Sequence, residues 1–184
     1  MTKRTSAAAA AILAAALGGS SCSGKGGGTP VTLLGYTASA PSYWQARPAG
    51  NTMRLAEYTL PASAGADPAE LVVYYFGAGQ GGSADANIAR WTAQFSAPGG
   101  GPVQPAVSQL EGTMYATTLA EFEGSYGRGM GMGPGRDEAK PDQALSAAVV
   151  ETPLGNLFVQ LFGPRAEVQA ARADFIAFVR SIRG

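Results

Sequence analysis

The feature that most constrains this chain is a short apolar run that ends just before its only cysteine. Residues 7–17 form an apolar stretch of eleven residues that follows the cationic pair Lys3 and Arg4. As a helix it would be roughly 16 Å long, about half the hydrocarbon thickness of a bilayer, so it cannot span one. A cationic start, an apolar run and small residues before a cleavage point are typical of a secretory signal. We therefore expect residues 1–21 to be removed by cleavage between Ser21 and Cys22.

Cys22 is the residue to which a lipid would be attached. The preceding segment, residues 18–21 (Gly-Gly-Ser-Ser), resembles the tolerant form of a bacterial lipoprotein signal, in which small or apolar residues precede the cysteine. It departs from the stricter form at Gly19, where that form has leucine. Several acyl chains anchor a protein stably, whereas a single chain does so only marginally. We expect an exported protein that is lipid-anchored to the bacterial cell envelope; the alternative is an ordinary cleaved signal that leaves a free thiol.

The residues after the cysteine suggest where the anchor lies. Ser23 is not aspartate, and by analogy with enterobacterial sorting this favours the outer membrane. Residues 22–30 are rich in glycine and polar residues, a composition typical of a flexible linker. We expect this lipidated linker to hold residues 31–184, a length that suits a single domain, beside the bilayer.

Composition narrows the chemistry that is possible. The chain has no histidine, one cysteine, and 13 basic residues against 13 acidic ones. Without histidine there is no Ser-His-Asp or Cys-His arrangement and no histidine metal ligand. A single cysteine forms no disulfide within the chain, and no basic stretch suits nucleic acid. We expect a protein that is not an enzyme, binds no cofactor, metal or nucleic acid, and has the membrane and a partner protein as its contacts.

Apolar patterning predicts an α+β domain in which helices flank an antiparallel sheet. In residues 53–60 alternation places Met53 and Leu55 opposite Arg54 and Tyr58. One helix is expected to follow Ser83 and another to run from residues 163–164 to residue 182, each with an apolar stripe. Residues 124–142, rich in Gly and Met, are expected to form a long mobile loop. Strands are predicted at residues 31–37, 53–60, 71–76, 107–110, 114–122, 144–151 and 156–162.

Several of these segments together resemble a known group of proteins. They are Trp44 and residues 53–58 (MRLAEY), 76–82 (FGAGQGG), 87–91 (NIARW) and 158–164 (FVQLFGP). In this combination the chain resembles uncharacterised bacterial lipoproteins and exported proteins that are similar to the PsbP-like α-β-α sandwich group. The resemblance implies an antiparallel sheet with helices on both faces. It implies no catalytic residue, because fold does not carry function.

Three motifs invite a sharper interpretation. Residues 77–82 match the G-x-G-x-x-G pattern of dinucleotide sites, but no acidic residue follows at the expected distance, so a tight glycine turn that opens a helix is favoured; an anion at the helix N-terminus is the alternative. Residues 130–132 (Met-Gly-Met) with Met114 offer soft copper(I) ligands, or simply a flexible loop. Glu121 and Glu123 share one face of a strand, as a solvated pair or as the carboxylates of a glycoside hydrolase.

One helix surface is the candidate partner-binding site. Asn87, Arg90 and Trp91 lie three and four residues apart, and Trp and Arg dominate interface hot spots. The same residues would also suit packing on the sheet and bonding to neighbouring loops. The function expected is a lipid-anchored envelope module that binds or assembles a partner protein. The alternative is a small-ligand carrier or hydrolase with its site under residues 124–142.

Overall fold

A computed structural model describes residues 28–127 and 139–184. The predicted signal peptide, its cleavage point at Ser21 and Cys22, most of the linker, and the methionines of residues 130–132 lie outside these ranges.

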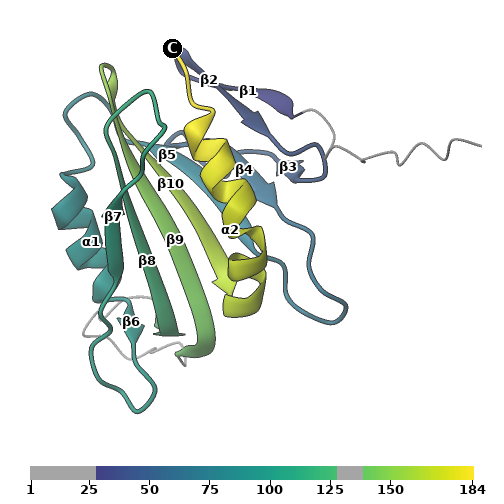
Figure 1. The fold of residues 1–184 in the computed structure, drawn as a ribbon, viewed down its shortest axis with the longest axis vertical. Helices are drawn as coiled ribbons and strands as arrows, with labels where there is room; N and C mark the ends of the chain where they lie inside the picture. Colours follow the sequence, from purple (N-terminus) through teal and green to yellow (C-terminus); the bar gives the residue numbers. More distant parts are fainter. Residues whose placement is uncertain (1–27, 128–138) are drawn as a thin grey trace, which may run out of the picture.

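The described chain is mostly antiparallel sheet with two helices (Figure 1). An eight-stranded sheet has the order β3-β4-β5-β10-β9-β8-β6, with β7 also paired to β8, and β1 and β2 form a separate hairpin. The strands are β1 (Thr29–Leu33), β2 (Tyr36–Ala40), β3 (Gln45–Arg47), β4 (Arg54–Thr59), β5 (Glu70–Tyr75), β6 (Phe95–Ser96), β7 (Ala106–Gln109), β8 (Thr117–Tyr126), β9 (Lys140–Thr152) and β10 (Gly155–Pro164); the helices are α1 (Ala84–Thr92) and α2 (Arg165–Arg180).

The centre of the sheet is the long hairpin of β9 and β10. Its existence was predicted, and its strands extend further than the apolar runs that indicated them. Every residue of β9 from Gln143 to Val150 is buried, because both faces of the sheet are covered. Successive side chains alternate between two cores: Ala148 and Val150 lie in one, and Ala147 and Val149 lie in the other.

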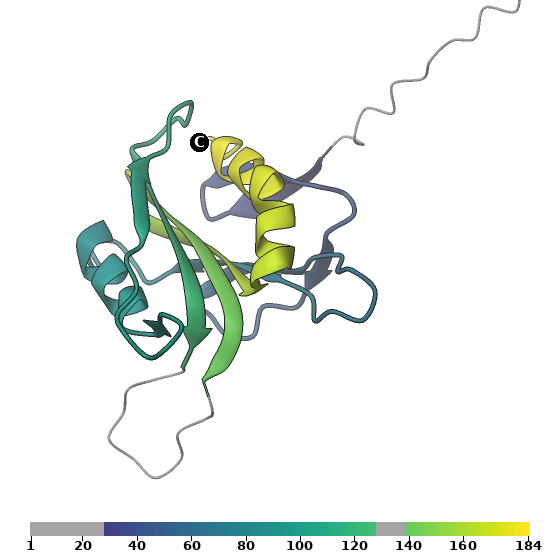
Figure 2. The same cartoon turned by 60° about the horizontal axis from the view of Figure 1, so that its bottom comes forward.

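The two faces are covered differently. Helix α2 packs on β9 and β10 and also contacts β2, and its side chains Val168, Phe175, Phe178 and Val179 are buried there (Figure 2). The opposite face is covered by the short helix α1, whose Trp91 is buried, together with Phe95 and Val103 from the chain that follows it. The predicted antiparallel α+β class is confirmed. The layers are more sheet-dominated than the expected α-β-α sandwich, because one covering helix is short and the hairpin β1–β2 accompanies the other.

Three local predictions are wrong. Residues 31–37 are not one strand, because the chain reverses at Leu34 and Gly35 between β1 and β2. Alternation in residues 53–60 fails because the β4–β5 register shifts between Arg54 and Ala56, and Tyr58 consequently packs in the core. The loop expected over residues 124–142 is shorter, since β8 continues to Tyr126 and β9 begins at Lys140.

The glycine-rich segment after β5 is a tight connection into α1. Ser83 is the N-cap, and its side chain accepts a hydrogen bond from the backbone N–H of Ala86 at 3.2 Å, as predicted. Gly81 has a φ of +87°, and a Cβ placed there would lie 2.6 Å from Phe158 Cε2 and 2.9 Å from Phe76 Cδ2. Glycine at this position therefore satisfies both the backbone and the two neighbouring rings.

Replacing Gly81 by alanine is expected to lower the free energy of unfolding by about 2–4 kcal/mol, since a positive φ and overpacking each cost one or more kcal/mol. Gly79→Ala is the matched control, because Gly79 has a φ of +69° and nothing within 4 Å of an added Cβ. Urea unfolding of both variants isolates the contact with the rings. Equal losses in the two variants would contradict this explanation.

Candidate functional site

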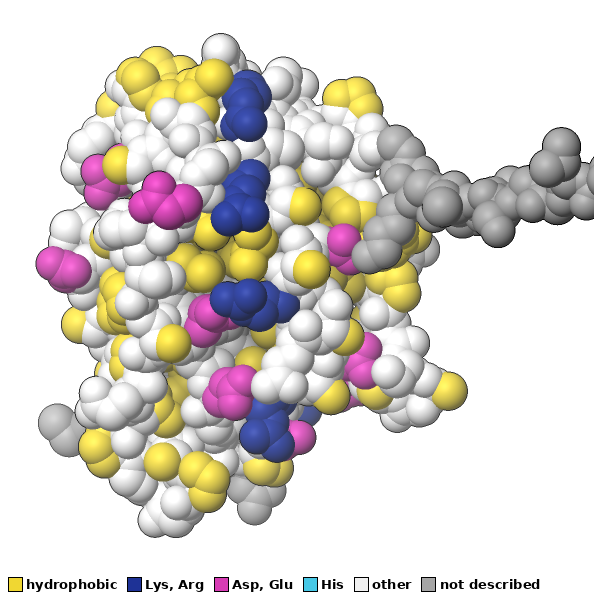
Figure 3. Space-filling view, viewed as in Figure 1, with side chains coloured by type: hydrophobic (Ala, Val, Ile, Leu, Met, Phe, Trp, Pro, Cys, Tyr) yellow, Lys and Arg dark blue, Asp and Glu magenta, His cyan; other side chains and the backbone are white. Residues whose placement is uncertain are grey.

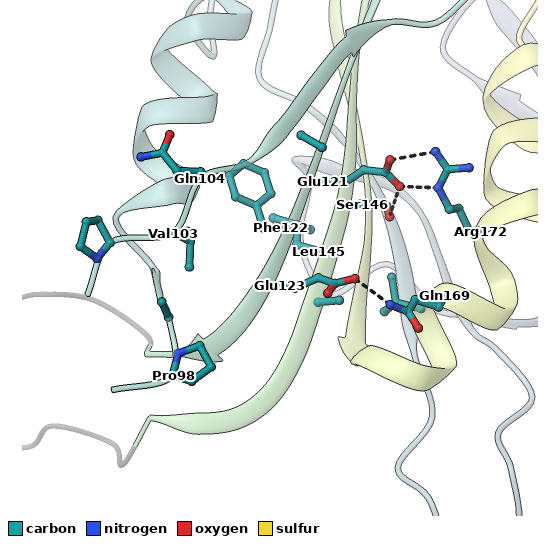
Figure 4. Close-up of a pocket in the computed structure, with 15 residues that line it drawn as sticks. Pro98, Val103, Gln104, Glu121, Phe122, Glu123, Leu145, Ser146, Gln169 and Arg172 are labelled. Carbon is teal, nitrogen blue, oxygen red and sulfur yellow. Dashed lines mark hydrogen bonds and ion pairs between the residues drawn. The ribbon is translucent and has the colours of Figure 1, made fainter. Parts of the chain in front are cut away.

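A groove runs around the outer edge of β8, between the loop of residues 97–106 and helix α2 (Figure 4). Its volume is about 580 Å³. Val103, Gln104 and Phe122 lie on one side of β8, and the side chains of α2 lie on the other (Figure 4). We call this hollow the β8 groove. It is lined by Ala97, Pro98, Pro102, Val103, Gln104, Ala106, Glu121, Phe122, Glu123, Ala144, Leu145, Ser146, Val168, Gln169 and Arg172.

Each charged group of the β8 groove has a partner of opposite charge: Arg172 pairs with Glu121, and Glu123 lies 3.9 Å from Arg165, which is outside the groove. Arg172 donates from Nε and Nη2 to the two carboxylate oxygens of Glu121, at 2.6 and 2.8 Å. The hydrogen bond to Glu121 raises the pKa of Arg172. Gln169 donates to Glu123 at 2.7 Å, and Ser146 donates to Glu121 at 3.4 Å. The wall of the groove is therefore polar but carries little uncompensated charge.

The predicted carboxylate pair does share one face of β8. Glu121 and Glu123 both point toward α2, as their spacing of two residues requires. Both oxygens of Glu121 accept hydrogen bonds from the guanidinium of Arg172 in a bidentate arrangement. The general acid of a glycosidase must donate a proton to the glycosidic oxygen. Because Arg172 occupies both oxygens of Glu121, this carboxyl group is not placed for that role.

The edge of β8 has a gap in its strand pairing within the groove. Pairing with β7 ends at Glu121, and pairing with β6 begins at Ser125. No strand of the described chain pairs with Phe122 and Glu123 on this edge. Unpaired backbone groups on a strand edge can hydrogen-bond to a segment from another chain.

Two further arginines of α2 are also held by neighbouring groups, one by a carboxylate and one by a backbone carbonyl. Arg165 forms an ion pair with Asp142 at 2.7 Å, and Arg180 donates to the backbone carbonyl of Glu111 at 2.8 Å. Basic side chains form a column down this face of the molecule, with acidic side chains beside the lower ones (Figure 3). Each exposed pair contributes only about 0–1 kcal/mol, so these contacts orient side chains more than they stabilise the fold.

A second hollow, of about 310 Å³, lies on the face of the sheet that is not covered by α2. Val72, Tyr74 and Gln160 line it from the neighbouring strands β5 and β10. Tyr126 and Lys140 also line it. Its volume is near the lower end of the range for small-molecule sites.

Arg54 brings a cation to the second hollow. Its guanidinium lies 5.4 Å from the centroid of the Tyr74 ring and donates to Glu57 at 2.9 Å. The backbone N–H of Gly50 and the Arg54 guanidinium hold the pKa of Glu57 below its usual range. Arg54 Nε is buried without a hydrogen-bond partner in the described part of the chain.

The predicted partner-binding residues lie mostly in the interior. Asn87 is buried and donates to the carbonyls of Gly81 and Ser83, at 2.8 and 2.9 Å, which fixes the glycine turn. Trp91 is buried and packs edge-on against a phenylalanine ring of β8. Arg90 is exposed and donates to Asn87 at 3.2 Å. The three residues thus form no continuous exposed patch, because the inner side of α1 faces the sheet; binding of a partner by Arg90 stays a prediction.

Two further observations concern the described ranges only. Nowhere in residues 28–127 and 139–184 do three or more acidic, cysteine or histidine side chains group closely enough to hold a metal ion. Neither helix of that part is long and apolar enough to cross a membrane.

Comparison with known proteins gives a likeness of fold. No protein-family model matches the sequence, and no curated protein matches it either. The solution structure of cyanobacterial PsbP (CyanoP) from Synechocystis sp. PCC 6803 matches with a TM-score of 0.53 at 10% identity, over 91% of this chain and 98% of that one. A crystal structure of a protein of unknown function from Pseudomonas aeruginosa, PA94, described as a putative regulator, matches with a TM-score of 0.49 at 17% identity, over 86% of this chain and 98% of that one. The PsbP-like fold expected from the sequence is supported by the first of these.

Proposed function

We propose that this chain is a lipid-anchored module of the bacterial cell envelope that binds a partner protein through the β8 groove. The observation that carries this proposal is the groove itself, in which an apolar floor lies beside side chains whose charges are already paired. Such a surface suits a protein segment, which brings apolar side chains and backbone hydrogen-bonding groups together. The gap in pairing at Phe122 and Glu123 offers backbone groups to that segment.

Two features of the sequence support the rest of the proposal. The segment that ends at Cys22 has the pattern of a lipoprotein signal, and Ser23 favours the outer membrane. The chain contains no histidine, and Glu121 is committed to Arg172. A non-enzymatic role is therefore proposed, with binding as its activity.

Site-specific photo-cross-linking in cells tests this proposal. A photoreactive amino acid at Gln169, which lines the groove, is expected to give a discrete cross-linked product of higher mass. The control is Ala177, which is exposed on the same helix and does not line the groove. The same products from both positions, or none from Gln169, would contradict partner binding in the groove.

The small-ligand alternative is favoured by one observation, the second hollow. Gln160 projects into it from a central strand, between Val72 of β5 and Ala147 of β9 in register. If the small-ligand hypothesis is correct, extraction of the native protein with organic solvent releases a bound molecule. Gln160→Leu is expected to reduce that release, because the amide is the polar group that β10 contributes to the lining of the hollow.

A further inference from the structure

Three strand connections meet at one end of the molecule, and each presents an apolar side chain to solvent. Leu34 lies in the β1–β2 turn, Met114 lies in the β7–β8 connection, and Leu154 lies in the β9–β10 turn (Figure 1). Their side chains are 42%, 54% and 48% exposed. We call these three residues the apolar tip. Hydrophobic side chains gather at this end of the molecule in the space-filling view (Figure 3).

Neighbouring contacts hold the apolar tip in place. Leu154 donates its backbone N–H to the Tyr36 hydroxyl at 3.1 Å, and its carbonyl accepts from the Tyr75 hydroxyl at 2.7 Å. Tyr36 also packs edge-on against Tyr115, with ring centroids 5.4 Å apart, next to Met114. The turns are thus joined to one another, and the partly exposed leucine and methionine side chains extend from a backbone that these contacts hold in place.

Leu34 has a backbone conformation that favours glycine over leucine. It has a φ of +60° in a two-residue hairpin turn. Glycine is preferred at a positive φ in such turns, and leucine there carries steric strain. An exposed leucine contributes little packing that would offset this strain. The stability of the fold therefore gives no reason for a leucine at this position.

The tether places the apolar tip within reach of a bilayer. The described chain enters the domain near Thr29, at the far end of β1 from the tip. The five residues of β1 therefore place Thr29 roughly 17 Å from the apolar tip. Seven residues connect Cys22 to Thr29 and span up to about 24 Å when extended. A lipid attached at Cys22 therefore leaves enough chain for the tip to touch the membrane surface.

Charge near the apolar tip is mixed. Arg180 and Arg183 lie at this end of α2, Glu111 lies beside Arg180, and Glu151 lies next to the β7–β8 connection. These groups do not form the basic cluster that recognises anionic headgroups. The apolar side chains must then provide the attraction, so a zwitterionic surface should serve as well as an anionic one.

We propose that the apolar tip rests in the interfacial layer of the bilayer to which the chain is tethered. This inference rests on the proposed lipid anchor. It turns the long axis of the strands toward the membrane and leaves the β8 groove, on the side of the molecule, open to a partner. The anchor then fixes the distance of the domain, and the tip fixes its orientation.

Depth-dependent fluorescence quenching tests this orientation in the acylated mature protein, which begins at Cys22, reconstituted in phosphatidylcholine vesicles. Acylation occupies Cys22, so an introduced cysteine is the only free thiol. An environment-sensitive fluorophore is placed on Pro153→Cys, beside the tip, or on Ala66→Cys, an exposed control in the loop at the opposite end of β5. A label buried about 5–10 Å into the interface is expected to shift its emission to the blue and to be quenched by nitroxide lipids severalfold more than the control.

A variant that changes only the tip completes the test. Leu34→Gly with Met114→Ser is expected to abolish most of the quenching at residue 153, and glycine suits the positive φ so the fold is retained. Equal quenching at residues 153 and 66 in protein whose mass shows the acyl chains would overturn the tip docking and leave the anchor standing. A blue shift without lipid quenching would place a second copy of the chain on the tip and overturn the proposal. Absence of acyl mass would overturn both proposals.

Discussion

Replacing Phe178 by alanine is expected to lower the free energy of unfolding by about 3–5 kcal/mol, the range for removing a fully buried aromatic side chain. Phe178 is 0% exposed and lies between α2 and the sheet. Its ring centroid is 5.7 Å from that of Trp44 and 6.5 Å from that of Tyr58. Removal of the ring leaves a cavity between α2 and β4. The shift in urea midpoint at constant slope measures this loss.

The neighbouring residue provides the control for this prediction. Ala177 is exposed on the same turn of α2, so Ala177→Ser is expected to change the free energy of unfolding by no more than about 0.5 kcal/mol. If Phe178→Ala were no more destabilising than this control, α2 would not be packed on the sheet as described.

Replacing Cys22 by serine is expected to move the protein from the membrane fraction to the soluble fraction. A hydroxyl does not take the place of the sulfur to which the lipid is proposed to be attached, so the variant carries no acyl chain to hold it at the bilayer. Two or more acyl chains anchor stably, whereas weaker apolar contacts exchange rapidly. Fractionation of cells that express each form, followed by immunoblotting, measures the shift.

The residue beside the cysteine separates anchoring from sorting. Ser23→Ala keeps the lipid acceptor and is expected to remain with the membrane as the parent chain does. If Cys22→Ser stayed with the membrane fraction to the same extent as Ser23→Ala, lipid attachment at residue 22 would not be what holds the protein there.

Side-chain patterning was enough to predict the central part of the fold. The run at residues 71–76 is continuous and apolar, and those at residues 144–151 and 156–162 are mostly apolar; each corresponds to a strand of the structure whose two faces are covered. Patterning failed where the backbone departs from regular geometry. The turn at Leu34 has no glycine at its first position, where the positive φ would favour one. The register shift after Arg54 is not marked by any characteristic residue type in the sequence.

The candidate site was predictable only in part. The spacing of Glu121 and Glu123 placed both on one face of a strand, which the structure confirms. Their partners come from α2, more than forty positions later in the chain, and long-range pairing of this kind is not visible in local periodicity. One signal was present: Arg165, Arg172 and Arg180 recur at intervals of seven and eight residues, close to two helical turns. Such a basic stripe beside an apolar one indicates the margin of a helix, where it borders a sheet.

The burial of Asn87 and Trp91 shows why residue type alone did not predict which side chains of α1 are exposed. Trp and Arg are enriched at interfaces, but tryptophan is also a large apolar side chain for covering a sheet. With nine residues, α1 has one inner side, and Trp91 occupies it. The β8 groove, where partner binding is proposed, lies where α2 stops short of covering β8, which depends on the placement of the whole helix.

The intact mass of the native protein, extracted from membranes in detergent, tests the lipid anchor most directly. The account predicts a chain that begins at Cys22 and carries the added mass of a diacylglycerol with an amide-linked acyl chain. A chain that begins elsewhere, or an unmodified cysteine at residue 22, would contradict it.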